Sequence, residues 1–173
     1  MKKILIYLLS IGIFGVASIA NSQTIRIGTE GAYPPWNNLN SAGELEGAEI
    51  DFGNEACKRM GVTCEWVTQD WDGIIPALLQ GKYDIIIAGM SITEERKEKV
   101  NFTTGYMTDG ARFAVLKNSG LANLNIAGMA KVNLNNAGGK EQAAIGQLIA
   151  AMDGKTVCVQ SSTIHQNFLE KHM

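Results

Sequence analysis

The sequence predicts an α/β fold in which a mostly parallel sheet is covered by helices on its faces. Three apolar segments, 24–29, 64–67 and 84–88, have the length and composition of buried strands. Helix-forming segments at 50–60 and 74–79 separate these strands. This alternation is typical of parallel sheets, because each connection between parallel strands crosses one face of the sheet. Since open α/β sheets bind ligands at the carboxyl ends of their strands, we expect a site in the loops that follow.

The chain begins like an exported protein. A methionine and two lysines precede an apolar run at 4–20, which closes on small residues. This pattern predicts a secretory signal peptide at 1–22, cleaved after Ala20 or Ser22. A membrane anchor is the alternative, but the run is short, contains Ser and Gly residues and is followed by polar residues. We therefore expect no stable membrane insertion once the signal is removed.

Composition and charge narrow the classes of partner. The formal net charge is −2, and loss of the two lysines of the signal makes it about −4. Mild acidity argues against a nucleic-acid partner. His165 and His172 are seven residues apart with no carboxylate beside them, which is not the spacing of a metal site. We expect neither a metal nor a cofactor.

Polar and aromatic residues follow the first two predicted strands. In the first loop, two prolines between Tyr33 and Trp36 exclude a helix or a central strand. Glu30 in this loop is an acid that can pair with a cationic side chain or an amine. Tyr33, Trp36 and Trp71, the last from the second loop, can form the walls of a pocket. The alternative is that Trp36 and Trp71 belong to the core.

The segment after the third strand has the features of a carboxylate receptor. Ser91 and Glu94 have the spacing of a capping box, which predicts that a helix begins here. Backbone N–H groups at the start of a helix attract anions. Arg96 lies one turn into the helix and can make a two-pronged contact with a carboxylate. The alternative is a capped surface helix with Arg96 in solvent.

Two of the three cysteines flank a predicted helix–turn–strand. Cys57 lies near the end of the helix, Gly61 in the turn and Cys64 at the start of the strand, which can bring the two Cα atoms within bridging distance. A disulfide is favoured in an exported protein, and two buried thiols are the alternative. Cys158 lies in an apolar segment and is expected in the core.

For the remainder of the chain, the sequence predicts a less regular secondary structure. Segment 111–116 resembles a strand that leaves the first part of the fold. Segment 118–153 is rich in Asn, Gly and Ala and has one helical stretch at 141–152, and one interpretation of it is a disordered loop. A buried strand at 156–160, a hydroxyl-rich turn and a helix through Phe168 follow. This repeats the strand–turn–helix plan of the Arg96 region, so a second anion-facing edge is plausible.

An ordered set of motifs resembles a known family. The motifs are Tyr33–Pro34–Pro35–Trp36, Gly47–x–x–Ile50–Asp51, Ser91–Ile92–Thr93–x–x–Arg96 and Phe102–Thr103. Together they resemble the polar amino-acid-binding proteins that serve periplasmic ABC uptake transporters, which are solute-binding protein family 3. Within it, the chain is most similar to the lysine/arginine/ornithine, histidine and octopine/nopaline group. The resemblance covers residues 24 to about 116 and resumes from 154 to the end.

The resemblance implies a type II periplasmic-binding-protein-like fold with two lobes. Residues 23–112 would form the first lobe, and 113–173 a crossover, an insertion and the start of an incomplete second lobe. In the family the second lobe continues and the chain then returns to the first. We therefore expect a fragment, a truncated gene product or a missing part supplied elsewhere. We also expect that the chain as written binds its ligand weakly or not at all.

The resemblance also implies roles for individual residues. Tyr33 and Trp71 would flank the ligand side chain, while its amino and carboxylate groups would meet Ala88, Gly89 and Ser91. Relatives often have Ser at two of these positions, so the contacts of Ala88 and Gly89 have to be made by backbone.

Further implied roles involve both lobes. Arg96 would clamp the carboxylate, with Ser162 and Thr163 contacting it from the other lobe. Related histidine-binding proteins also carry a cysteine pair in the place that matches Cys57 and Cys64.

The expected function is capture of a polar, preferably cationic, amino acid or an opine in the periplasm, and its delivery to the membrane permease of an ABC transporter. We expect a monomeric binding protein when complete, and no enzyme. One alternative is an enzyme on the same scaffold, such as a periplasmic dehydratase of prephenate or arogenate. It would need a positioned acid or base, for which Glu30 is the candidate. The other alternative is a truncated product without function.

Overall fold

The computed structural model describes residues 23–124, 126 and 138–173. The predicted signal peptide at 1–22 and part of the predicted insertion lie outside these residues. Along the chain, the elements of the N-terminal part are β1 Thr24–Thr29, β2 Ala32–Tyr33, β3 Asn37–Leu39, β4 Leu45–Glu46, α1 Ala48–Met60, β5 Thr63–Thr68, a 3₁₀ turn Trp71–Gly73, α2 Ile74–Leu79, β6 Ile85–Ile86 and α3 Glu94–Lys97. The C-terminal part contains α4 Gly139–Met152 and α5 Ile164–His172.

The predicted α/β fold with a parallel sheet is confirmed. The strand order is β5–β1–β6, and β1 is parallel to both neighbours, with Ile27 opposite Trp66 on one side and Ile85 on the other. The third strand is shorter than predicted, since β6 covers only Ile85–Ile86. One more hydrogen bond to β1 follows β6, because the Ile87 N–H donates to the carbonyl of Gly28 at 3.0 Å.

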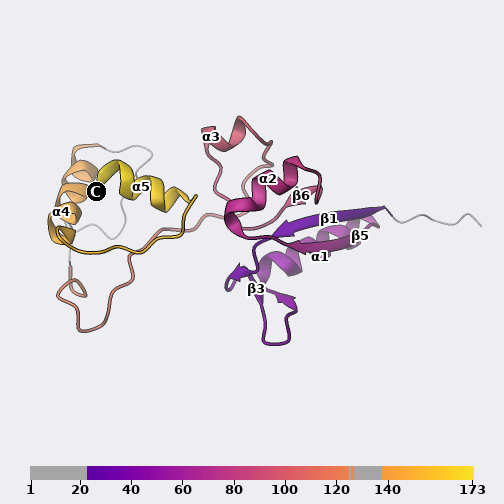
Figure 1. Cartoon of the computed structure of the whole chain (residues 1–173), viewed down its shortest axis with the longest axis horizontal. Coiled ribbons are helices and arrows are strands. Elements are labelled where there is room, and N and C mark those ends of the chain that lie inside the picture. Colours follow the sequence, from indigo (N-terminus) through magenta and orange to yellow (C-terminus); the bar gives the residue numbers. More distant parts are fainter. Residues whose placement is uncertain (1–22, 125, 127–137) are drawn as a thin grey trace, which may run out of the picture.

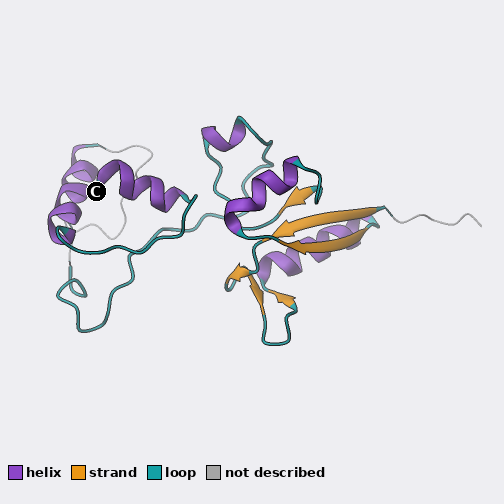
Figure 2. Ribbon diagram, viewed as in Figure 1, coloured by secondary structure: helices purple, strands orange, loops and turns teal. Residues whose placement is uncertain are grey.

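Helices cover both faces of this sheet (Figure 2). On the α1 face, Ile27, Cys57 and Ile87 form a buried cluster. On the α2 face, a second cluster contains Ile74, Ala77, Tyr83 and Ala88. Burial of apolar surface on the two faces is the main stabilising contribution to this lobe. Met60, the last residue of α1, is exposed.

A small antiparallel sheet precedes α1. Its strand order is β2–β3–β4, and a turn after Leu39 connects β3 to β4. Gly47 joins β4 to α1 with φ of 125°, and a Cβ there would lie 2.3 Å from the carbonyl oxygen of Trp36. The missing side chain lets that carbonyl accept the N–H of Glu49 at 2.9 Å, so the start of α1 is held against the hairpin.

The C-terminal part differs most from the prediction. Helices α4 and α5 are present and lie apart from the sheet (Figure 1). Segments 111–116 and 156–160 were predicted as strands and form none. Cys158, expected in the core, is exposed. Apolar residues alone do not make a strand, and in the described residues neither segment has a neighbouring strand to satisfy its backbone.

No helix in residues 23–124, 126 and 138–173 combines the length and the apolar character that spanning a bilayer requires.

The predicted disulfide between Cys57 and Cys64 is present, with the two Cα atoms 5.9 Å apart. It joins the end of α1 to the start of β5. Replacing both cysteines by serine should lower the free energy of unfolding by roughly 2–3 kcal/mol, because the short loop no longer restricts the unfolded chain. Denaturant unfolding measures this, with Cys158→Ser as the matched control. Alkylation of Cys57 and Cys64 in the non-reduced protein would contradict the bridge.

A two-pronged ion pair joins β1 to the start of β6. Arg26 Nη2 lies 2.7 Å from Asp84 Oδ1, and Arg26 Nε donates to Asp84 Oδ2 at 3.2 Å. Hydrogen bonding from Arg26 lowers the pKa of the Asp84 carboxyl below its usual value.

Because the pKa of Asp84 is lower in the folded protein, its stabilising contribution is complete above the unfolded pKa and is lost as the pH falls through the folded pKa. We predict that the difference in unfolding free energy between the parent and Asp84→Asn narrows below about pH 4. Urea unfolding across pH measures it, with Asp51→Asn controlling for net charge. A difference that does not vary with pH would be inconsistent with this assignment.

Candidate ligand-binding site

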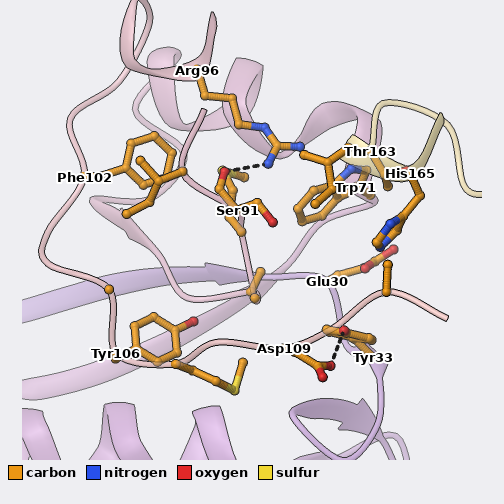
Figure 3. A pocket seen from close by; sticks show the side chains of 18 of the residues that line it. Glu30, Tyr33, Trp71, Ser91, Arg96, Phe102, Tyr106, Asp109, Thr163 and His165 are labelled. Atoms are coloured by element: carbon orange, nitrogen blue, oxygen red, sulfur yellow. Dashed lines mark hydrogen bonds between the residues drawn. The ribbon is translucent and has the colours of Figure 1, made fainter. Parts of the chain in front are cut away.

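A cavity of about 450 Å³ lies at the carboxyl ends of the parallel strands (Figure 3). Glu30 follows β1, Trp71 follows β5, and the loop 88–91 follows β6. Segments 102–112 and 160–165 complete its wall. The volume is in the range of pockets that hold small molecules. The location is the one that the strand order predicts.

Most of the residues predicted to bind ligand line this cavity. They are Glu30, Tyr33, Trp71, Ala88, Gly89, Ser91, Arg96 and Thr163. Trp36 and Ser162 are not among the described lining residues. Trp36 is half-buried beside the start of α1. Ser162 reaches this region through its backbone carbonyl, as described below. Whether any of these residues contacts a ligand stays a prediction.

Arg96 is held at one end of the cavity by two backbone carbonyls. Its Nη1 donates to the carbonyl of Ser91 at 2.8 Å, and its Nη2 to that of Ser162 at 3.1 Å. The guanidinium carbon lies 5.3 Å from the ring centroid of Trp71, which adds a cation–π contact. Burial lowers the pKa of Arg96, but a guanidinium remains protonated at neutral pH. The alternative of Arg96 in solvent is therefore wrong.

The predicted capping box at Ser91 is also wrong. Helix α3 has four residues, and its N-cap is Thr93, whose Oγ1 accepts the N–H of Arg96 at 3.2 Å. Two hydroxyl residues lie two positions apart, and only Thr93 has the extended backbone of an N-cap next to the helix. Ser91 consequently belongs to the loop and lines the cavity. A single helical turn also contributes little dipole, so the positive charge at this end comes mainly from Arg96.

Two carboxylates also line the cavity. Glu30 Oε1 accepts a hydrogen bond from Gln160 Nε2 at 2.5 Å. The Tyr33 hydroxyl donates to Asp109 Oδ2 at 3.4 Å (Figure 3). Burial, followed by the charge of Asp109, raises the pKa of Tyr33, so its hydroxyl stays protonated and remains a donor. The cavity thus combines Arg96 and Arg112 with two carboxylates and several aromatic rings.

Sequence reasoning missed a whole wall of the cavity. Residues 102–112 run along it in irregular conformation and contribute Phe102, Tyr106, Asp109 and Arg112. Phe102 was noted only as part of a motif, and no local pattern distinguished the others. Two aromatic residues and an acid in a glycine-containing irregular segment were the available signal. The position of a segment without helix or strand periodicity depends on the residues that it contacts. The sequence does not show those contacts.

The C-terminal segment 160–163 meets the first lobe at the cavity. The Trp71 indole N–H donates to the carbonyl of Ser162 at 3.0 Å. Ser161 Oγ donates to the carboxylate of Asp72 at 3.0–3.1 Å. Thr163 is buried and forms the N-cap of α5, because its Oγ1 accepts the N–H of Gln166. Ser91 and Ser162, one from each hydroxyl-rich turn, both accept a hydrogen bond from Arg96 through their carbonyls, although no strand precedes the second turn. That the second turn forms an anion-facing edge stays a prediction.

Metal binding has no geometric support in the part of the chain that the structure describes. No group of three or more His, Cys, Asp or Glu side chains there is placed to hold a metal ion.

Gly89 brings the backbone of the loop after β6 close to Tyr33. Its φ is 58°, and a Cβ at this position would lie 3.0 Å from the Tyr33 ring. Gly89→Ala should cost about 1 kcal/mol for the left-handed backbone and more for displacing the ring. Gly43→Ala is the matched control, because Gly43 has φ of 79° with nothing near its absent Cβ. Equal losses of unfolding free energy in the two variants would show that the Tyr33 contact is unimportant.

Several curated proteins are similar to this chain in sequence. The octopine-binding periplasmic protein of Rhizobium meliloti is 44% identical over 153 residues, covering 88% of this chain and 52% of that protein. The L-arginine-binding protein of Pseudomonas aeruginosa is 41% identical over 122 residues, covering 70% and 47%. The lysine/arginine/ornithine-binding periplasmic protein of Escherichia coli is 39% identical over 120 residues, covering 68% and 46%. The chain spans about half the length of these curated relatives.

A solved structure is also similar. It is a periplasmic His/Glu/Gln/Arg/opine family-binding protein from Silicibacter pomeroyi in complex with lysine, 59% identical, with a TM-score of 0.48, covering 50% of this chain and 39% of that one. The sequence profile of the bacterial extracellular solute-binding proteins, family 3, matches residues 25–166, which is most of the chain. This chain belongs to the bacterial extracellular solute-binding proteins, family 3.

Proposed function

We propose that this chain binds a polar amino acid, preferably a cationic one, or an opine, as the receptor of an ABC uptake transporter. The observation that carries the proposal is that one cavity combines arginine side chains, two carboxylates and aromatic rings. Arg96, Glu30 and Asp109 all line it, with Arg112 as a second cation. A ligand with a carboxylate and a distant cationic group matches this arrangement. Its relatives named above bind octopine, arginine, or lysine, arginine and ornithine.

The carboxylate of the ligand would bind at Arg96. Ser91 holds one edge of the guanidinium, so the group is oriented before the ligand arrives. The described contacts of the Arg96 side chain use Nη1 and Nη2, and a guanidinium has five N–H donors in all. Charge-assisted, two-pronged hydrogen bonds are among the strongest available in proteins. Backbone groups of Ala88 and Gly89 would contact the amino end of the same ligand.

The side chain of the ligand would lie between aromatic residues. Tyr33 and Trp71 line the cavity with Phe102 and Tyr106, and aromatic faces attract cationic groups. Glu30 and Asp109 would then compensate the charge of a lysine, arginine or opine side chain. A neutral ligand would leave these carboxylates without a cation, which favours the cationic class.

Segment 160–163 would close over the bound ligand from the C-terminal side. Ser162 and Thr163 would contribute from this edge, and we propose the lobe boundary near residue 112. Two-lobed receptors bury their ligand by hinge closure. Relatives are periplasmic, and we propose the same compartment and an ABC permease as partner.

An enzyme on the same scaffold is the second candidate. Glu30 would have to transfer a proton, but its hydrogen-bond partner is the amide of Gln160. An amide does not exchange protons as an acid or a base at neutral pH, so nothing described here couples Glu30 to a catalytic partner. This supports a receptor over a dehydratase. Incubation with prephenate and arogenate, followed by mass spectrometry of the products, tests the point.

Arg96→Ala should weaken binding by on the order of 3 kcal/mol, or about a hundredfold, because the charge-assisted contact with the carboxylate is lost. The measurement is titration of the purified chain with L-arginine, L-lysine and octopine by calorimetry, or by NMR where binding is weak. Arg59→Ala is the matched control, since Arg59 lies on α1 and pairs with Glu55. An affinity for Arg96→Ala within about threefold of the parent would refute the role of Arg96.

A further inference from the structure

Glu49 is a buried carboxylate that does not belong to the described lining of the cavity. It lies in the first turn of α1 and is 2% exposed. Its Oε2 accepts from Asn37 Nδ2 at 2.7 Å, and its Oε1 accepts from the Gly89 N–H at 2.7 Å. The Tyr106 hydroxyl donates to the same Oε1. A buried carboxylate is costly without such partners, so these three donors and Glu49 depend on one another.

Two of the three donors belong to segments that line the cavity, and the third is bonded to another such segment. Gly89 belongs to the loop after β6, and Tyr106 belongs to the segment 102–112. Asn37 connects Glu49 to the third segment, the loop after β1. Its Oδ1 accepts the N–H of Gly31, next to Glu30, at 2.8 Å. One carboxylate therefore connects all three walls from beneath. Apolar packing cannot do this as specifically, because it has no direction.

We propose that Glu49 is a positioning residue for the ligand site. Its carboxylate holds the loop after β1, the loop after β6 and Tyr106 at the separations that ligand binding requires, and Glu49 itself does not contact the ligand. This inference rests on the proposed function, since it assumes that the cavity binds an amino acid.

The direction of each hydrogen bond makes the inference testable. The Gly31 N–H can only donate, so the oxygen of the Asn37 amide faces Gly31 and its NH₂ group faces Glu49. Glu49→Gln introduces an NH₂ group that must oppose either the NH₂ of Asn37 or the N–H of Gly89. Asn37→Asp instead places two carboxylates face to face. Either change leaves a buried group unsatisfied.

The double variant Asn37→Asp/Glu49→Gln restores the pattern with the groups exchanged. The new carboxylate at position 37 accepts from Gly31 and from the new amide at position 49. The oxygen of that amide still accepts from Gly89 and Tyr106. We expect each single variant to weaken L-arginine binding about tenfold or more, and the double variant to return to within about threefold of the parent. Glu55→Gln, an exposed position on the same helix, is the matched control.

NMR on the ligand-free chain gives a readout that a general structural role would not move. Exchange of the Gly89 amide should accelerate in Glu49→Gln and recover in the double variant. The Ile87 amide, bonded within the sheet to Gly28, should be unaffected. Equal acceleration of both amides, or unchanged binding and exchange in Glu49→Gln, would overturn the inference.

Two further results distinguish a failure of this inference from a failure of the proposed function. If the parent binds none of L-arginine, L-lysine and octopine, the proposed function fails, while exchange at Gly31 and Gly89 still decides whether Glu49 holds the walls. If Glu49→Gln does not fold, the double variant decides. Recovery of folding together with parent-like exchange supports the inference, and failure to recover overturns it.

Discussion

The cavity depends on the parallel register of β1, β5 and β6. Because the three strands run in one direction, the loops that follow them meet at one edge of the sheet. An antiparallel neighbour would send its loop to the opposite edge. Apolar clusters on both faces hold the strands in place. Hydrophobic burial thus determines where the cavity forms, and the side chains of the loops determine its chemistry.

Each of three charged side chains in the cavity has a hydrogen-bond partner that holds it in place. Carbonyls of Ser91 and Ser162 hold Arg96, while Gln160 and Tyr33 hold the two carboxylates, Glu30 and Asp109. Such contacts orient the charges before a ligand arrives, which reduces the cost of binding. Several of these contacts come from segment 160–163. The C-terminal part therefore belongs to the site even though it adds no strand to the sheet.

Patterns within short segments predicted much of the fold. The helix at 74–79 and the Cys57–Cys64 disulfide depend on neighbours close in sequence, and both are present. The strand at 24–29 is also present, because it finds partners in β5 and β6. Segments 111–116 and 156–160 have apolar residues like those of strands but form none, because a strand also needs a partner to satisfy its backbone. Likewise, Ser91 was predicted as the cap of α3, and the structure places Thr93 there, with the extended backbone of an N-cap.

The sequence by itself determined the fold class, the strand ends where a site can form, and Arg96, Glu30 and Tyr33 as its candidates. These follow from local periodicity and from the residue types in three loops. Only the tertiary structure decided that Tyr106 and Asp109 complete the wall and that Glu49 lies beneath it. Glu49 lies 40 residues from Gly89 and 57 from Tyr106, and Tyr33 lies 76 from Asp109. Hydrogen bonds across such separations leave no periodic signal in the sequence, because they exist only once the hydrophobic core has brought the segments together.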